Sequence, residues 1–197
     1  MRRRTFDFIA TAIGGVLTIV LLVAGGLAMW GYTFANNSVH DQLAAQQIYF
    51  PDQGSPALKS PEVGPYLNQY AGQQLTTGAQ AKAYADHFIA VHLKEVADGK
   101  TYAQVSSEAQ ANPKDATLQA QVNTLFKGEA LRSMLLQAYA FWQIGQIALW
   151  AGIASFILAG LMLILTIFGL IHLRRVDPQT ELLPPSDKHP KLEPASA

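Results

Sequence analysis

The stretch FIATAIGGVLTIVLLVAGGLAMW, Phe8 to Trp30, decides the fold class. It lies in a window between Asp7 and His40 that contains no Asp, Glu, Lys, Arg or His. A helix of its 23 residues reaches about 34 Å, and the hydrocarbon core of a bilayer is about 30 Å thick. A second stretch of 25 residues, IALWAGIASFILAGLMLILTIFGLI, runs from Ile147 to Ile171. Because backbone groups in lipid need internal hydrogen-bond partners, we predict that both stretches are transmembrane helices.

The basic residues at the start also fit a secretory signal peptide. Arg2, Arg3 and Arg4 precede the first apolar stretch. However, that stretch is longer than the roughly 7–15 apolar residues of a cleaved signal, and no clear cleavage site follows Trp30. We therefore expect an uncleaved signal anchor.

The same basic residues predict the orientation. Arg2, Arg3 and Arg4 precede the first stretch, and Arg174 and Arg175 follow the second. Basic residues next to a span favour the cytoplasmic side, so we predict a plasma-membrane protein with both termini in the cytoplasm. Trp30 and Trp142 are expected to be aromatic anchors at the outer interface. The predicted organisation is a cytoplasmic N-terminus (1–8), a first span (9–32), an extracytoplasmic helical domain (33–143), a second span (144–172) and a disordered proline-rich cytoplasmic tail (173–197).

The segment between the spans is expected to be a small helical bundle. Residues 36–48 extend the first span, and the four prolines of 51–65 indicate a loop packed through Tyr66, Leu67 and Tyr70. Thr77 with Gln80, and Thr101 with Gln104, have the capping-box spacing, which predicts helices to about Asp98 and about Ala111. Asn112, Pro113 and Asp115 predict a third start, opening one long helix into the second span with Gly128 and Gly145 as flex points. The expected buried stripe of the first of these helices is Ala81, Tyr84, Ala85, Phe88, Ile89, His92 and Val96.

The composition excludes several function classes. The 14 basic and 14 acidic residues give a formal net charge of zero, and nucleic-acid binding proteins usually carry a basic field. With no cysteine, the chain has no disulfide, thiolate metal site or thiol nucleophile. The sequence also contains no nucleotide-binding loop and no nucleophile elbow. We therefore predict no enzyme activity, no catalytic residue and no cofactor.

The histidines of the outer segment leave one alternative open. His87 and His92 are five residues apart, whereas two helical metal ligands need a spacing of three or four. We expect packed or interface histidines and no metal site; a metal site with His40 and Asp86 is the alternative. Glu129 and Arg132 are spaced for an ion pair, Asp86 is expected on a solvated helix position, and His172 is expected to be an interfacial anchor.

Small residues predict close helix packing in the bilayer. They recur every four residues in the second span, and Gly14 lies in a similar pattern in the first. Such residues let helix backbones approach closely, either between the two spans or with another subunit. The predicted packing positions are Gly14, Ala148, Gly152, Ser155, Ala159 and Gly160.

Several segments resemble actinobacterial two-span membrane proteins without an assigned activity. They are RRRTFD (2–7), FANNSVHDQLAAQQIYFP (34–51), YADHFIAVHL (84–93), TLFKGEALRSMLLQAYAFWQIGQIA (124–148) and LRRV (173–176). The resemblance covers most of residues 1–176. It implies a plasma-membrane location and no catalytic residue.

We therefore expect a non-enzymatic membrane protein that presents a helical outer domain to an envelope partner, as an accessory or scaffolding subunit or as a homo-oligomer. The alternatives are a sensor-like ligand-binding module that relays through a cytoplasmic partner, and an envelope metal-binding protein.

Overall fold

The computed structural model describes residues 3–175, and they form helices without a β-strand. Two helices are long and apolar enough to cross a membrane: α1, Arg3–Ala45, and α7, Ala116–Arg175. The prediction of an all-helical chain with two long apolar helices is therefore confirmed for this part of the chain. Of the predicted tail, residues 173–175 belong to α7 and the rest lies outside the described residues.

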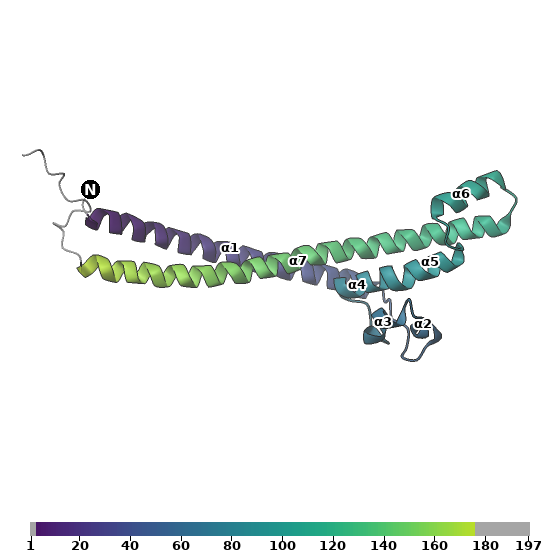
Figure 1. Cartoon of the computed structure of the whole chain (residues 1–197), viewed down its shortest axis with the longest axis horizontal. Helices are drawn as coiled ribbons and strands as arrows, with labels where there is room; N and C mark the ends of the chain where they lie inside the picture. The colour runs from purple at the N-terminus through teal and green to yellow at the C-terminus, as the bar shows by residue number, and fades with distance from the viewer. Residues whose placement is uncertain (1–2, 176–197) are drawn as a thin grey trace, which may run out of the picture. The chain divides into compact units, whose positions relative to one another are not determined.

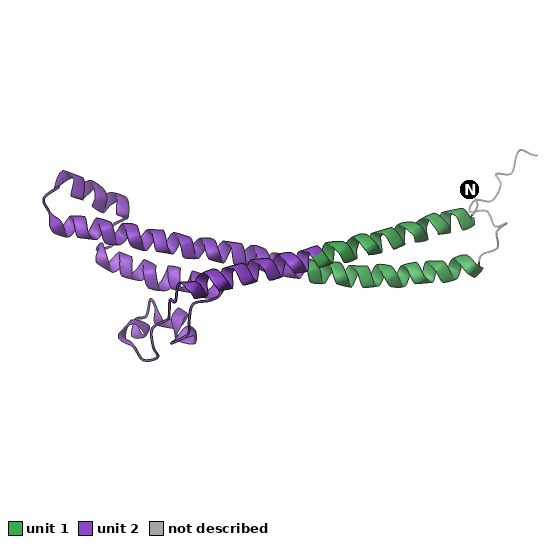
Figure 2. Cartoon of the chain, turned by 180° about the vertical axis from the view of Figure 1, so that it is seen from behind, with its two compact units in different colours: residues 1–26, 152–197 green, residues 27–151 purple. Residues whose placement is uncertain are grey.

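The chain divides into two compact units, which Figure 2 shows in different colours. Unit 1 comprises residues up to Gly26 and from Gly152 onward, and unit 2 comprises Leu27–Ala151. In unit 1, the first part of α1 and the last part of α7 form an antiparallel pair. In unit 2, the remaining parts of α1 and α7 carry all the shorter helices (Figure 1).

Unit 2 contains a hydrophobic core built from nearly every element. Its shorter helices are α2 (Pro56–Lys59), α3 (Gly64–Leu67), a 3₁₀ turn (Asn68–Tyr70), α4 (Gly78–Tyr84), the π-helical turn η2 (Ala85–Ile89), α5 (Ala90–Val96) and α6 (Tyr102–Ala111). The largest fully buried side chains are Leu67, Leu75, Val105, Leu125 and Leu135.

Both predicted capping boxes are present. The Thr77 hydroxyl accepts a hydrogen bond from the Gln80 amide, and Thr101 accepts one from Gln104, with the glutamine side chain returning to the cap in each case. The second box opens α6, which ends at Ala111 as predicted. Gly99 adopts a left-handed conformation, with φ at 77°, and its N–H donates to Lys94 O. The local capping signals therefore set these helix boundaries correctly.

The predicted start of the long helix was wrong. Asn112 belongs to the end of α6, where its side-chain amide donates to Glu108 O. The N-cap of α7 is Asp115, whose Oδ1 accepts from the N–H groups of Thr117 and Leu118 at 2.9 and 3.1 Å. An aspartate can accept from the second and third helical amides only when it lies directly before the helix. Proline 113 therefore precedes α7 and does not occupy its first turn.

The proline-rich segment 51–65 contains short helices where a loop was expected. Pro56 is the first residue of α2 and Pro65 the second residue of α3, positions in the first helical turn where the missing N–H of proline costs no hydrogen bond. Leu67 is completely buried, and Tyr70 packs against the core, as predicted, whereas Tyr66 is 47% exposed.

The stripe predicted for residues 81–96 differs from the buried one. The buried residues are Ala81, Ala85, Ile89, Leu93 and Ala97, which recur every fourth residue. A regular α-helix has 3.6 residues per turn, so such a column would drift around it. The π turn at 85–89 adds backbone to one turn and so offsets the drift. His92, which was predicted on the stripe, is exposed.

Candidate functional site: a polar pair in unit 1 and a charge cluster in unit 2

The two helices of unit 1 pack through small and hydroxyl-bearing residues. A Cβ added to Gly14 would lie 2.8 Å from the Thr166 hydroxyl, and one added to Gly169 would lie 2.6 Å from the Thr11 hydroxyl. Gly25 faces the Phe156 ring, from which an added Cβ would be 3.0 Å away. Thr18 is buried, and its hydroxyl donates to Gly14 O. Glycine therefore allows a close backbone approach at three levels of this pair.

The predicted packing residues are found on more than one face. Gly14, Gly152 and Ala159 are buried, and Ser155 is half-buried. Gly160 is exposed, with nothing within 4 Å of the position of an added Cβ. In unit 2, Ala148 is half-buried. Sequence reasoning missed the threonines Thr11, Thr18 and Thr166. In α1, successive members of the series Asp7, Thr11, Gly14 and Thr18 are four, three and four residues apart. Such alternating spacing is typical of a seam, the side of a helix that packs along a neighbouring helix.

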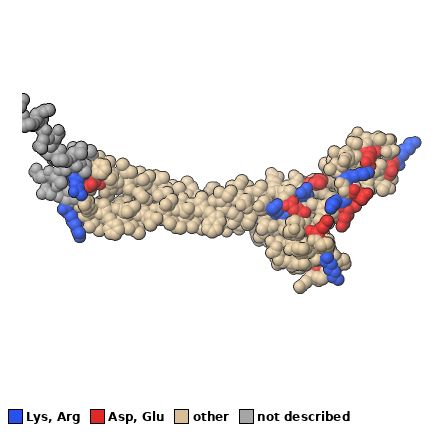
Figure 3. All heavy atoms as spheres, in the orientation of Figure 1, with Lys and Arg blue, Asp and Glu red and all other residues tan. Residues whose placement is uncertain are grey.

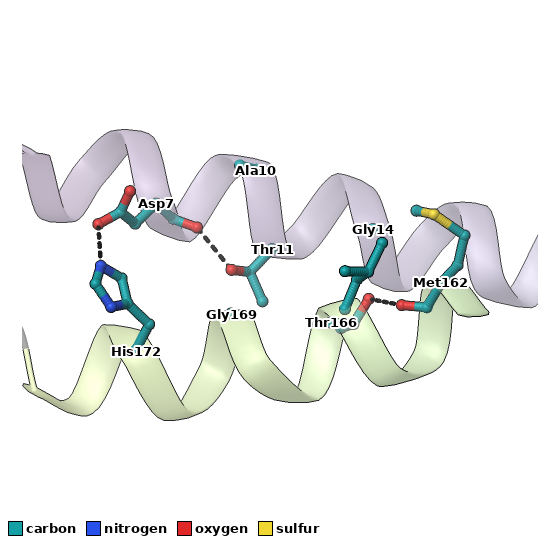
Figure 4. Close-up of a pocket in the computed structure, with 9 residues that line it drawn as sticks. Asp7, Ala10, Thr11, Gly14, Met162, Thr166, Gly169 and His172 are labelled. Atoms are coloured by element: carbon teal, nitrogen blue, oxygen red, sulfur yellow. Dashed lines mark hydrogen bonds and ion pairs between the residues drawn. The ribbon is translucent and has the colours of Figure 1, made fainter. Parts of the chain in front are cut away.

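A polar site lies at the end of the pair where α1 begins and α7 ends (Figure 4). The Asp7 Oδ2 is 3.7 Å from His172 Nε2 and 3.9 Å from Arg3 Nε. This oxygen is buried and accepts no hydrogen bond from any described residue. The Thr11 hydroxyl donates to Asp7 O at 2.7 Å, and the Thr166 hydroxyl to Met162 O at 2.7 Å.

These side chains border a cavity of about 250 Å³. His172 lies in the last turn of α7. The contact between Asp7 and His172 therefore joins the start of α1 to the end of α7. The sequence analysis placed Asp7 at the limit of the first apolar window and His172 as an interfacial anchor, but it did not predict their contact, which joins opposite ends of the chain.

Unit 2 contains a second charge cluster, centred on Asp86 in the π turn. Its Oδ2 accepts from Lys82 Nζ at 2.6 Å, and its Oδ1 accepts from Arg132 Nη2 at 3.4 Å. Arg132 also pairs with Glu129 at 3.5 Å, which confirms the ion pair predicted between them. The expectation that Asp86 is solvated was wrong, because its side chain is only 24% exposed. The cluster joins the π turn to α7.

The charges set the protonation of the cluster. Burial by itself would raise the pKa of Asp86, but the hydrogen bond and charge of Lys82, with a smaller contribution from Arg132, lower that pKa below its ordinary value. The hydrogen bond to Asp86 in turn raises the pKa of Lys82. Asp86 and Lys82 are therefore both charged at neutral pH.

The aromatic and arginine residues predicted as anchors are mostly exposed. Trp30 is 68% exposed and stacks on Phe34, with ring centroids 5.7 Å apart. Trp142 is half-buried and lies against Gly78, the first residue of α4. The arginines at the ends of the described chain are also exposed, namely Arg3, Arg4, Arg174 and Arg175, whereas Arg2 lies outside the described residues.

Comparisons with family models, with curated proteins and with solved structures found no match to this chain.

Two of the three histidines considered for metal binding make separate contacts. His87 stacks on Tyr66, with ring centroids 3.5 Å apart and planes 3° from parallel. His40 pairs with its neighbour Asp41 at 3.2 Å. Within residues 3–175, no three His, Asp or Glu side chains lie close enough together to hold a metal ion.

Proposed function

We propose that the chain is a non-enzymatic plasma-membrane protein that crosses the bilayer twice and presents residues 33–143 outside the cell. In this proposal it acts as an accessory or scaffolding subunit of a cell-envelope complex. This proposal includes the resemblance to actinobacterial two-span membrane proteins that the sequence segments indicate.

One observation carries the membrane assignment. The most apolar 18-residue windows of α1 and α7 are only 11% and 6% buried by the rest of the chain. The core helix of a soluble protein would be mostly buried, and soluble monomers rarely expose large contiguous apolar surfaces. On the face drawn in Figure 3, charged side chains are absent from most of the helix pair of unit 1 and reappear at its end. The hydrocarbon core of a bilayer would keep this apolar surface out of water.

The polar pair of unit 1 supports the orientation. Because Asp7 contacts His172, the start of α1 and the end of α7 lie at the same end of the helix pair. Arg3, Arg4 and Arg174 are exposed near that end. The positive-inside rule then favours the cytoplasm for both termini.

The contacts made by Asp86 and His87 in unit 2 support a binding role over catalysis. The Asp86 carboxylate is held by two cations, and the His87 ring is stacked on Tyr66. A general base needs to be within hydrogen-bond reach of a reacting proton, and these two groups are occupied by structural contacts. We propose that the exposed surface of residues 50–127 recognises a partner.

Cysteine labelling tests the topology, because the natural chain has no cysteine. Lys114→Cys in unit 2 and Thr5→Cys at the start of α1 both replace exposed residues. A membrane-impermeant maleimide should label Lys114→Cys in intact cells and Thr5→Cys only after lysis. The unsubstituted protein is the control for background labelling. The reverse labelling pattern would refute the proposed orientation.

The accessory role requires a separate experiment. After extraction in mild detergent, the chain should migrate in a native gel with a reproducible protein partner, and deleting the chain should lower the amount of that partner in the membrane. Migration as a free monomer, with no protein depleted by the deletion, would refute the accessory role without affecting the topology.

A further inference from the structure

Unit 2 contains an apolar groove that the proposed function does not use. It lies between η2 and α5 on one side and α7 on the other, and has a volume of about 370 Å³. Its apolar lining includes Phe88, Leu93 and Leu131. An added Cβ at Gly128, which also lines the groove, would lie 2.9 Å from Leu93 Cδ1. The groove therefore falls within the volume range of small-ligand sites and has their mostly apolar lining.

The polar residues of the groove are few and exposed. They include His92, Thr124 and Lys127, which are all exposed to solvent. No aspartate or glutamate lines the groove, and among the described residues no carboxylate lies within ion-pair distance of Lys127. In contrast, Lys82 is held by Asp86 on the same helical segment. Lys127 is thus a cation next to an apolar surface and available to an anion.

The π turn contributes directly to this groove. Phe88 and Ile89 belong to the turn, and both line the groove. Isolated π turns are uncommon and occur frequently at functional sites. Tyr84, which precedes the turn, packs against Phe88 with ring centroids 4.8 Å apart, and burial raises the pKa of the Tyr84 hydroxyl. The Asp86 cluster fixes the same turn to α7.

We propose that this groove binds an acidic amphiphile, with a single acyl chain along the apolar lining and a carboxylate head at Lys127. The volume of 370 Å³ equals that of about twelve water molecules at roughly 30 Å³ each. A chain of about as many methylene groups therefore fits. His92 provides a further hydrogen-bonding group near the head, whereas the Thr124 hydroxyl already donates to Ala120 O. This inference rests on the geometry of the groove and not on the topology or the accessory role proposed above.

Photolabelling of the full chain in phosphatidylcholine nanodiscs tests the proposal. The probes are lauric acid, whose chain matches the length estimated above, with a diazirine in the chain, and the corresponding fatty alcohol. The acid should label peptides that contain Phe88 or Leu131. Lys127→Gln should lower labelling by the acid about threefold, the size of an exposed ion pair, and leave labelling by the alcohol unchanged. Thr124→Trp, which fills the groove from an exposed position, should lower labelling by both probes.

Two matched substitutions on exposed residues outside the groove serve as controls. Lys114→Gln removes another exposed lysine, and Ser133→Trp adds a tryptophan elsewhere on α7; neither should change labelling of the groove. Labelling confined to residues 8–26 and 152–171 would show simple partition into the bilayer and overturn the proposal. An unlabelled groove, with a protein partner lost on Thr124→Trp, would assign the groove to that partner and also overturn it.

Discussion

The contact between α4 and α7 predicts that Gly78→Ala destabilises unit 2. Gly78 begins α4, and a Cβ added there would lie 2.5 Å from Trp142 Cγ. Carbon atoms pack at about 3.5–4.0 Å, so one helix would have to move by about 1 Å. The atoms of Trp142 nearest to Gly78 include Cβ and Cγ, which cannot move without the backbone or a change of rotamer.

The magnitude follows from two opposing effects. Overpacking of a well-packed contact costs about 1–3 kcal/mol, whereas replacing glycine by alanine in a helix interior gains about 0.5–1 kcal/mol. Since Gly78 is the first residue of α4, the gain there is at the low end, and we expect a net loss of about 1–2 kcal/mol. At about 4 °C per kcal/mol for a unit of this size, the melting temperature should fall by about 4–8 °C.

Near-UV circular dichroism of the purified full chain in detergent measures this loss, because it reports aromatic packing. Gly31→Ala is the matched control, since Gly31 lies in the part of α1 that belongs to unit 2 and has nothing within 4 Å of an added Cβ. Its melting temperature should stay constant or rise. If Gly78→Ala were as stable as Gly31→Ala, Trp142 would not pack against the start of α4 as described.

Three further predictions concern the other contacts. Because the folded-state pKa of Asp86 is lowered, its ion pairs stabilise the fold above its ordinary pKa of about 4. In chemical unfolding, the natural protein should be more stable than Asp86→Asn from neutral pH to about 4, and this difference should disappear as the pH falls further. A difference in stability that grows in acid would contradict the assignment. Thr11→Cys with Gly169→Cys should form a disulfide under mild oxidation, detected as a shift on a non-reducing gel, since the Thr11 Cβ is 3.4 Å from the Cβ position of residue 169; failure to cross-link would argue against the seam of unit 1. Gln80→Ala should lower the melting temperature more than Gln104→Ala. Gln80 is 7% exposed, and its Oε1 accepts from the amides of Thr76 and Thr77; without it, the desolvation of these amides would cost about 1–3 kcal/mol. Equal losses in the two variants would contradict this reasoning.

The features that the sequence predicted well are those set by neighbouring residues. The capping boxes at Thr77 and Thr101 depend on a hydroxyl and an amide three residues apart. The two long apolar helices depend on length and composition. Each of these signals is contained within one segment, so no knowledge of packing was needed to find it. The error at Asn112 arose where two residues competed for one cap, and the helix geometry favoured Asp115.

The features that the sequence did not predict depend on distant pairs. Asp86 and Arg132 are separated by 46 positions, and Asp7 and His172 come from opposite ends of the chain. The charge of each residue did not identify its partner, because the chain contains several residues of opposite charge. The π turn is a similar case, since its buried column follows from contact with the core and not from the sequence period.

The distribution of polar contacts separates the structural roles of the two units. In unit 1, the threonine hydroxyls donate within their own helices, as Thr18 does to Gly14 O, and the Asp7–His172 contact joins the two helices at one end of the pair. In unit 2, polar side chains cross between elements, as when Gln121 Nε2 donates to Val96 O at 3.0 Å. In hydrocarbon there is no water to pair with polar groups, so hydrogen bonds within one helix are expected there. In water the hydrophobic effect packs separate elements together, and polar side chains can then bond between them. The two patterns are consistent with the proposal that unit 1 lies in lipid and unit 2 in water.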